Sequence, residues 1–463
     1  MRPAKAGLFL CLLYAAPAFA SARVVLLHFS DYHSHALPFY SEGRRDQGGI
    51  ARAIHYLDRA HRNGALVFSG GDMINKGSPS WSDKYTCAEW PWLNGIVDAM
   101  ALGNHDPDYG AGEFAECRSK IRYPILSANT NGFQRSAVFK SHGIRVGVFA
   151  LAGSDFPALV HTPGFTFSDR IAAARDVVAD LRQRADVVVL IGHETLDDDI
   201  TLAHRVPGID IILGTHSHLK RELEKIDGTN TWIISPFQYL TYISRVELTF
   251  DDEHKLTKVG GGLVRVDSHL PSDARIAKRV ASMESALEHD PQYSPLFVAI
   301  GRLKTGIRVE QLGEHTVALM RDVARADFAI STTSSFRQDL PPGTITMETL
   351  RNAMPYDNEI VTATMSGAQV QNLIDFKGDA AYHTPIKIDP NATYRVATTD
   401  YLTNVSAYKS FFSGVGVEKT GLRVREQLAV SFRASEASRG IPFARAVGSF
   451  DSLRSLAMTH NAQ

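Results

Sequence analysis

Cysteine is scarce in this sequence, with only Cys11, Cys87 and Cys117 among 463 residues. None of the three has a partner at Cys-x-x-Cys spacing, so cysteines are not expected to bind a metal ion. Export of the chain would permit a disulfide between Cys87 and Cys117. The alternative is two unpaired thiols, and the sequence leaves both possibilities open.

Net charge is also lacking, because 49 Lys and Arg residues face 50 Asp and Glu residues for a formal charge of -1. A chain with this balance has no global field to hold a nucleic acid polymer or an anionic membrane. Apolar residues make up 44% of the sequence, which is typical of a globular protein. A positively charged site must therefore be made locally.

Long hydrophobic runs are missing, and the one apolar run near the start, residues 8–16, is too short to be a permanent membrane anchor. Arg2 and Lys5 precede it, and Ala18-Phe19-Ala20 follows in the small-x-small pattern of a signal-peptidase site. Residues 1–20 are thus predicted to be a signal peptide. The mature chain would begin near Ser21 and be periplasmic or secreted.

The length of 463 residues favours two domains, with three as the alternative. In the first half, short apolar runs alternate with helical stretches such as residues 170–184, which predicts βαβ units with strands buried on both faces. In such layers, ligands and catalytic groups gather where strands end at their carboxyl side. The ends of these runs are therefore the places to look for a site.

Five of the runs end in Asp, His or Asn beside a glycine or a short turn. They are residues 23–29 before Asp31 and His33, 65–69 before Asp72, 99–102 before Asn104, His105 and Asp108, 186–191 before His193, and 209–213 before His216 and His218. Another run, residues 146–151, is expected to have no ligand at its end. A single histidine in such a place is more often an ordinary surface residue, as expected for His35, His55, His204 and His315.

Coincidence does not explain the whole set, because seven ligand-type side chains recur at equivalent positions. Two carboxylates, four imidazoles and one amide exceed the needs of one ion but suit two divalent ions about 3.5 to 4 Å apart. Asp72 is the best candidate for the bridging carboxylate. The predicted ligands are Asp31, His33, Asp72, Asn104, His193, His216 and His218.

The expected charge of such a site points to a phosphate ester. Two divalent ions bring about +4, two carboxylates about -2 and a bound hydroxide about -1, so the site stays near +1 and favours a phosphate dianion. The ions would lower the pKa of a bridging water from ~15.7 toward ~7. His105 is not needed as a ligand, so it can stabilise developing charge or protonate the leaving oxygen, while Asp108 fixes its tautomer.

The order Asp-x-His, Gly-Asp, Gly-Asn-His-Asp, Gly-His and Gly-x-His-x-His resembles the calcineurin-like metallophosphoesterases. The segments LLHFSDYHSH and IDIILGTHSHL are most similar to the secreted 5'-nucleotidase family. The resemblance implies a four-layer α/β/β/α sandwich, joined by a linker helix to a smaller α+β C-terminal domain.

The resemblance also implies how the ligands are shared between two ions. Asp31, His33, Asp72 and His218 would surround one ion. The other would be held by Asp72, Asn104, His193 and His216, with His105 and Asp108 as the catalytic pair. The family more usually has Glu and Phe where this chain has Asp106 and Pro107, a change that could alter the geometry of His105 and Asp108.

A linker helix is predicted between Pro271 and Pro291, where Ser272 can cap an amphipathic helix that ends near His289. The expected domain limits are residues 21–268 for the metallophosphoesterase domain, 269–291 for the linker helix and 292–463 for the 5'-nucleotidase-like domain. Weaker family motifs between residues 300 and 432 support the last of these.

The second domain departs from the family at its substrate loops. Thr332 to Phe336 lack the two glycines of the usual Asn-x-Gly-Gly-Ile-Arg, although Arg337 is kept, and Asn404 to Ala407 replace Gly-Gly-Asp-Gly. Tyr356 and Tyr401 could sandwich a flat ring, or Tyr356 could be a core aromatic and Arg337 a surface charge. The predicted substrate-binding residues are Arg302, Arg337, Tyr356, Asn358 and Tyr401.

Three functions follow from these observations. The leading one is an exported phosphohydrolase with two ions of zinc, manganese, iron or cobalt, which converts phosphomonoesters, 5'-nucleotides foremost, to an alcohol and phosphate. The lost glycines motivate a second, hydrolysis of a cyclic nucleotide, a dinucleotide or a non-nucleotide ester. The third is an exported binding protein with a structural metal site, against which His105 and Asp108 count. The oligomeric state stays open.

Overall fold

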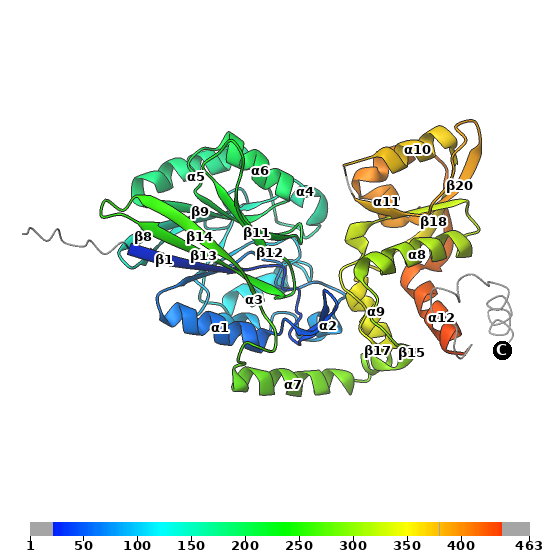
Figure 1. Cartoon of the computed structure of the whole chain (residues 1–463), viewed down its shortest axis with the longest axis horizontal. Coiled ribbons are helices and arrows are strands. Elements are labelled where there is room, and N and C mark those ends of the chain that lie inside the picture. Colours follow the sequence, from blue (N-terminus) through cyan, green and yellow to red (C-terminus); the bar gives the residue numbers. More distant parts are fainter. Residues whose placement is uncertain (1–21, 379, 438–463) are drawn as a thin grey trace, which may run out of the picture.

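The computed structural model describes residues 22–378 and 380–437, so the predicted signal peptide lies outside the described residues. Two domains stand side by side, the larger built from the first half of the chain (Figure 1). It contains two six-stranded sheets. The first has the order β14 (Leu256–Arg265), β13 (Tyr242–Phe250), β1 (Ala22–Phe29), β4 (Leu66–Ser69), β5 (Ala99–Ala101) and β6 (Ile125–Leu126).

The second sheet has the order β11 (Lys220–Lys225), β12 (Trp232–Pro236), β10 (Ile211–Gly214), β9 (Val187–His193), β8 (Ile144–Ala152) and β7 (Ser136–Ser141). The facing sides of the two sheets share one core, in which Leu26 and Phe68 pack with Val148 and Val189. Since these strands are buried on both faces, they are nearly continuous apolar runs, as the sequence predicts.

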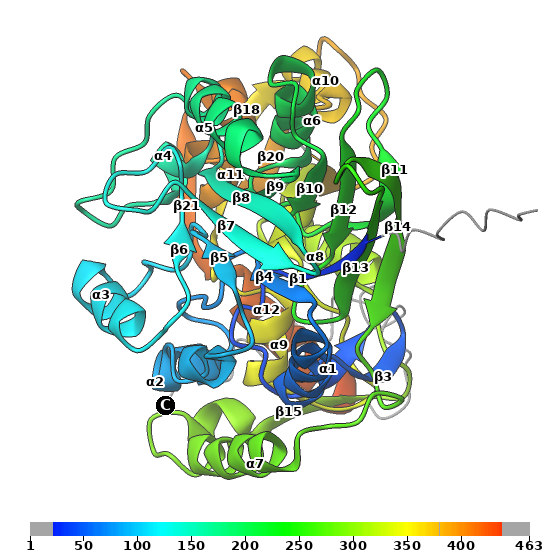
Figure 2. The same cartoon turned by 90° about the vertical axis from the view of Figure 1, so that its left-hand side faces the viewer.

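Helices cover the two outer faces of the sheets. Ile50 and Ile54 of α1 (Ile50–Arg62) pack on the first sheet, and α5 (Arg170–Arg184) and α6 (Leu196–Arg205) pack on the second. Figure 2 shows α5 and α6 on one side of the sheets and α1 on the other. The predicted layering α/β/β/α is therefore confirmed.

Parallel pairing brings several strand ends to one edge. β1 is parallel to β4 and β4 to β5, while β8, β9 and β10 run parallel to one another. Their carboxyl ends therefore meet at a shared edge of the sandwich, the position from which the sequence predicts a site.

The smaller domain has a five-stranded sheet with helices on both faces. Its order is β19 (Ala381–His383), β16 (Phe328–Thr332), β20 (Thr393–Thr399), β18 (Glu359–Ser366) and β21 (Val417–Arg423). One face packs against α8 (Val309–Val323), α9 (Met347–Ala353) and α12 (Val424–Ala437), and the other against α10 (Gly367–Asp375) and α11 (Asp400–Asn404). A two-stranded sheet of β15 (Ala299–Leu303) and β17 (Gly343–Thr346) adjoins α9.

The predicted linker helix corresponds to α7 (Ala274–Glu288). Its N-cap is Asp273 and not Ser272, because the Asp273 carboxylate accepts hydrogen bonds from the backbone N–H groups of Arg275 and Ile276. Ser272 was the wrong choice because two adjacent residues have suitable side chains, and the local sequence does not determine which one adopts the cap conformation.

Cys87 and Cys117 form a disulfide, so the bridged alternative holds in this structure. The bond joins the segment after α2 (Ser80–Tyr85) to α3 (Ala111–Ser119). Both sulfurs are used in this bond. Across the described residues, no helix is long and apolar enough to cross a membrane.

Candidate metal centre

Six of the predicted ligands follow the carboxyl ends of β1, β4, β5 and β10, and His193 is the last residue of β9. Asp31, His33, Asp72, His216 and His218 all have φ between 46° and 57°. Non-glycine residues seldom adopt this left-handed conformation, and clusters of it occur mostly at functional sites. The chain thus bends sharply just after β1, β4 and β10 and turns these side chains toward one another.

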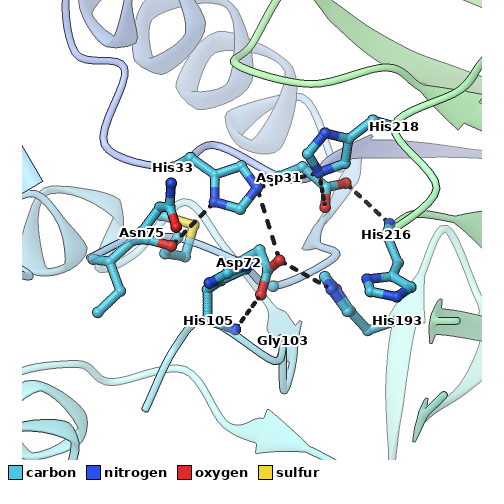
Figure 3. A network of polar contacts seen from close by, with 12 residues as sticks. Asp31, His33, Asp72, Asn75, Gly103, His105, His193, His216 and His218 are labelled. Carbon is cyan, nitrogen blue, oxygen red and sulfur yellow. Dashed lines mark hydrogen bonds and ion pairs between the residues drawn. The ribbon is translucent and has the colours of Figure 1, made fainter. Parts of the chain in front are cut away.

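One group consists of Asp31, His33 and His218, whose potential ligand atoms all lie within 4.8 Å of one another (Figure 3). Nε2 of His218 lies 3.2 Å from Nε2 of His33 and 3.2 Å from Oδ1 of Asp31. Asp31 and His33 are almost completely buried. Two imidazoles and a carboxylate converging in this way suit a divalent transition-metal ion.

A second group consists of Asp72, His193 and His216, again with potential ligand atoms within 4.8 Å of one another. Asn104 is buried, and its Oδ1 has no hydrogen-bond partner among the described residues. A buried amide oxygen without a partner is costly, so it calls for a ligand such as a cation. The donors present therefore fit a metal ion.

Asp72 lies between the two groups. Its Oδ2 is 3.3 Å from Nε2 of His193 and 3.8 Å from Nε2 of His33, while its Oδ1 accepts a hydrogen bond from the His105 backbone N–H at 2.8 Å. Gly103 makes this approach possible, because a Cβ there would come within 2.2 Å of Oδ1 of Asp72. Asp72 thus lies within reach of nitrogen donors from both groups.

Backbone carbonyls orient two of the imidazole rings. Nδ1 of His193 lies 2.6 Å from the Gly70 carbonyl oxygen, and Nδ1 of His33 lies 3.1 Å from that of Ile74. Donation of Nδ1–H to these oxygens leaves the Nε2 lone pair of each ring facing the cluster. A metal-binding histidine usually has its second nitrogen fixed in this way.

The electrostatics of the cluster favour a bound cation. Burial alone would raise the pKa of Asp72, but the imidazoles of His193 and His105 outweigh it and hold that pKa well below its usual range. Burial alone would lower the pKa of His193, yet Asp72 raises it to about 9. The buried carboxylates thus attract positive charge, which a divalent ion supplies without protonating a ligand.

His105 and Asp108 lie beside the cluster as a hydrogen-bonded pair. Nδ1 of His105 lies 2.8 Å from Oδ2 of Asp108, which also accepts the Lys76 backbone N–H at 3.1 Å. The His105 ring centroid is 5.3 Å from that of His33. Because Asp108 binds Nδ1, Nε2 is the ring nitrogen that points away from this carboxylate, and the Tyr356 hydroxyl lies 3.2 Å from it.

This chain has Asp106 where the family more usually has Glu, and His105 and Asp108 are still hydrogen-bonded. The buried Asp106 carboxylate accepts hydrogen bonds from the backbone N–H groups of Met73 at 2.8 Å and Gly103 at 2.7 Å. It thereby ties the two loops that carry Asp72 and Asn104. The carboxylate supports the loops instead of facing the cluster.

Asp155 is a contributor that the sequence argument missed. It follows β8, which was expected to end without a ligand, yet its Oδ2 lies 2.8 Å from Nε2 of His216. Burial would raise its pKa, but His216 outweighs this and lowers it. The available signal was its place three residues beyond the end of β8, since Asp72 stands three residues beyond the end of β4.

Two of the five predicted substrate-binding residues reach the cluster from the second domain. Arg337 contacts the ring nitrogens of His218, and the Tyr356 hydroxyl lies 3.2 Å from Nε2 of His105. By contrast, no hydrogen bond or ion pair within residues 22–378 and 380–437 joins Arg302 or Asn358 to the cluster. Arg302 is exposed on β15, and Tyr401 lies half-buried in α11.

Two family models match the chain. The calcineurin-like phosphoesterase model covers residues 24–220, and the 5'-nucleotidase C-terminal domain model covers residues 300–386. Protein UshA of Yersinia enterocolitica is 23% identical over 477 residues, covering 82% of this chain and 84% of that protein. The 5'-nucleotidase of Mus musculus is 26% identical over 325 residues, covering 60% and 56%.

Crystal structures of similar proteins share the fold. A 5'-nucleotidase precursor from Thermus thermophilus is 20% identical with a TM-score of 0.73, covering 89% of this chain and 97% of that one. A sulfate thiohydrolase, SoxB, from the same organism in complex with glycerol is 18% identical with a TM-score of 0.71, covering 89% and 94%. The chain thus belongs to the calcineurin-like phosphoesterases that carry a 5'-nucleotidase C-terminal domain, and it is a metal-dependent phosphoric ester hydrolase.

Proposed function

We propose that this protein is an exported phosphohydrolase with two metal ions, which hydrolyses phosphomonoesters, with 5'-nucleotides as its foremost substrates. The observation that supports this most is the position of Asp72, whose Oδ2 lies between His193 at 3.3 Å and His33 at 3.8 Å. One carboxylate placed between two groups of donors is the arrangement that a two-metal site requires.

The proposed ligands divide between two ions. Asp31, His33 and His218 would hold one ion, His193, His216 and Asn104 would hold the other, and Asp72 would serve both. When bound, such ions supply a water of lowered pKa as the nucleophile and neutralise the phosphoryl oxygens. The ligands alone do not select the metal, since zinc, manganese, iron and cobalt all accept imidazole and carboxylate.

His105 acts at the leaving group in this proposal. Asp108 accepts the hydrogen bond from Nδ1–H. Nε2 is therefore the ring atom that can give a proton to the alkoxide oxygen as the phosphorus–oxygen bond breaks. Asp108 keeps the imidazole in one orientation, since its Oδ2 lies 2.8 Å from Nδ1. Arg337 can bind two phosphate oxygens with its planar guanidinium.

The nucleotide part of the proposal draws on the relatives. Several are named 5'-nucleotidases, and one of Bacillus subtilis is named a trifunctional nucleotide phosphoesterase. One observation favours the second candidate, an ester with a different leaving group. In the loop after β16, Ser335 is buried and its hydroxyl lies 3.0 Å from that of Thr332, so side chains fill space where the family has glycine.

Phosphate release across a panel of substrates separates the two candidates. The panel holds nucleoside monophosphates, diphosphates, cyclic nucleotides, dinucleotides and sugar phosphates, with each of the four metals supplied in turn. The proposal expects a 5'-monophosphate among the best substrates. If monophosphates are among the poor substrates while a diester or a sugar phosphate is cleaved rapidly, the second candidate holds.

Export and the domain limits belong to the same proposal. Residues 1–20 would be removed near Ala20, and residues 21–268, 269–291 and 292–463 would form the metallophosphoesterase domain, the linker helix and the substrate domain. N-terminal sequencing of the protein recovered from a periplasmic or culture fraction tests the first point. A mature chain that begins at Met1 would contradict it.

A further inference from the structure

The hydroxyl of Tyr356 crosses from the second domain to the histidine next to the metal cluster. It lies 3.2 Å from Nε2 of His105, and the two rings are nearly parallel, with centroids 6.4 Å apart. Tyr356 is 37% exposed, so it is not a core residue. A ring that only stacks on a flat substrate has no need of this hydroxyl contact.

The contact completes the hydrogen bonding of the His105 ring. Asp108 already binds Nδ1 at 2.8 Å, and the Lys76 backbone N–H holds the same carboxylate oxygen at 3.1 Å. With the Tyr356 hydroxyl 3.2 Å from Nε2, both ring nitrogens have a partner of known position, and a leaving oxygen would approach Nε2 beside this hydroxyl. The imidazole plane is then fixed from two sides.

The segment that follows Lys76 also anchors the second domain. The Ser80 backbone N–H donates to the Glu348 carboxylate at 2.8 Å, and the Ser78 hydroxyl donates to the Arg351 carbonyl oxygen at 2.8 Å. Glu348 and Arg351 both belong to α9, and Glu348 is buried. Hydrogen bonds of a buried carboxylate are expensive to break, so α9 is held firmly on this segment.

Arg351 adds an ion pair to this interface. Its Nη2 lies 3.0 Å from Oδ2 of Asp83 and also donates to the Gly77 carbonyl oxygen. The loop that carries Tyr356 follows α9 directly. Arg425 of α12 fixes that loop through hydrogen bonds to the carbonyl oxygens of Met354 at 3.0 Å and Pro355 at 3.3 Å.

These contacts form a closed path. It runs from Asp108 to His105, on to Tyr356, through α9 to Ser78, and back through Lys76 to Asp108. The segment at residues 76–80 therefore fixes the position of Asp108, the carboxylate partner of His105. Through α9 it also fixes the position of Tyr356.

We propose that Tyr356 is a positioning residue for His105, supplied by the second domain and held in place by the contacts of α9. The inference rests on the proposed role of His105 at the leaving group. Its consequence is that docking of the second domain contributes to the chemical step and not only to substrate binding.

The first test is Tyr356→Phe, which removes the hydroxyl and keeps the ring. Rates are measured with 4-nitrophenyl phosphate and with a nucleoside 5'-monophosphate. Loss of the hydroxyl is expected to lower kcat about tenfold for both substrates while KM stays within about twofold, because the effect is on the histidine and not on binding. The matched control is Tyr394→Phe, in β20, whose hydroxyl accepts the Asp389 N–H at 2.7 Å and which should change neither constant.

A pure stacking role predicts a different pattern. Tyr356→Phe would then leave kcat unchanged, and Tyr356→Ala would raise KM for the nucleotide alone. That result would overturn the proposal.

Single variants, each combined in turn with Tyr356→Phe, test whether the contacts of α9 act through Tyr356. Ser78→Ala removes one hydrogen bond between the segment and Arg351, and Arg351→Met removes more. Each should lower kcat in the unmodified background and have less than about a twofold further effect when Tyr356→Phe is present. Effects that multiply independently would overturn the link through Tyr356. Ser78→Ala serves if Arg351→Met does not fold.

Nuclear magnetic resonance of protein with ¹⁵N-labelled histidine gives a readout that needs no activity. In the zinc-loaded protein, the Nε2 signal lost in His105→Ala is assigned to His105, and Tyr356→Phe should shift it. An unchanged signal would overturn the proposal even if catalysis is found. If the unmodified protein cleaves no phosphate ester with any metal, the proposed function fails. The resonance measurement still shows whether the Tyr356 hydroxyl contacts His105.

Discussion

Nε2 of His193 lies 3.3 Å from Oδ2 of Asp72, although 121 residues separate them in the sequence. The carboxylate comes from the first sheet and the imidazole from the second. The site therefore exists only when the two sheets are packed together, which links the shared core of the sandwich directly to metal binding.

Replacement of Asp72 should affect both proposed ions. Asp72→Asn keeps the shape of the side chain but removes the charge of the bridging group, so bound metal should fall from about two ions per chain to one or fewer. Activity should fall at least about 10³-fold. Metal content by elemental analysis and phosphate release measure the two effects. Asp58→Asn, at a surface ion pair with Arg62, is the control and should retain both metal and activity.

Replacement of His105 should separate chemistry from metal binding. His105→Ala removes the group at the leaving oxygen but no proposed ligand, so kcat should fall about 10² to 10⁴-fold with the metal content unchanged. His254→Ala, at a surface histidine, is the matched control. Unchanged activity and ligand affinity in His105→Ala would favour the binding protein with a structural metal site.

Asp155 should affect the affinity for the proposed ion near His216. Because its carboxylate holds Nε2 of His216 at 2.8 Å, Asp155→Asn should change the affinity for one ion about 10 to 100-fold and leave the other nearly unchanged. Competition with a chromophoric zinc chelator resolves the two affinities. The exposed Asp176→Asn is the control. Equal effects on both ions, or none, would argue against this local role.

Glu89, which is not a proposed metal ligand, should make the free energy of unfolding depend on pH. Burial raises its pKa to about 7, against an ordinary value of 4.5, so the folded chain keeps a proton that the unfolded chain releases between these values. The free energy of unfolding should therefore fall by about 3 kcal/mol as pH rises through this window. Above pH 7 the contribution should be constant.

Glu89→Gln tests this pH dependence. Its Oε1 can still accept the hydrogen bonds from Tyr32 and Trp81, but the group no longer titrates. Urea unfolding between pH 4 and pH 8 should show a flatter profile for the variant than for the unmodified protein. The exposed Glu253→Gln should keep the original slope, and an unchanged slope in Glu89→Gln would contradict the assignment.

The strand ends were predictable because their signals are local. An apolar run followed by a turn and a ligand-type residue identifies Asp31, Asp72 and His193 without knowledge of the fold. The parallel arrangement of the strands then requires that these ends meet. The fold class followed from the same alternation and from the resemblance.

Other features depend on contacts that no short segment reveals. The role of Asp155 arises from the packing of β8 beside β9 and from the turn that brings His216 to it. The contact of Tyr356 with His105 depends on how α9 docks on residues 76–83. Arg302 was chosen for its chemistry alone, and its strand places it on an exposed surface.

The most direct test of the central claim is a titration of metal into chelator-treated protein. Phosphate release from a nucleoside 5'-monophosphate is measured as zinc, manganese, iron or cobalt is added stepwise, with bound metal determined at each step. The account predicts negligible activity without metal and full activity at about two ions per chain. Full activity in the metal-free sample, or saturation of activity at one ion, would contradict it.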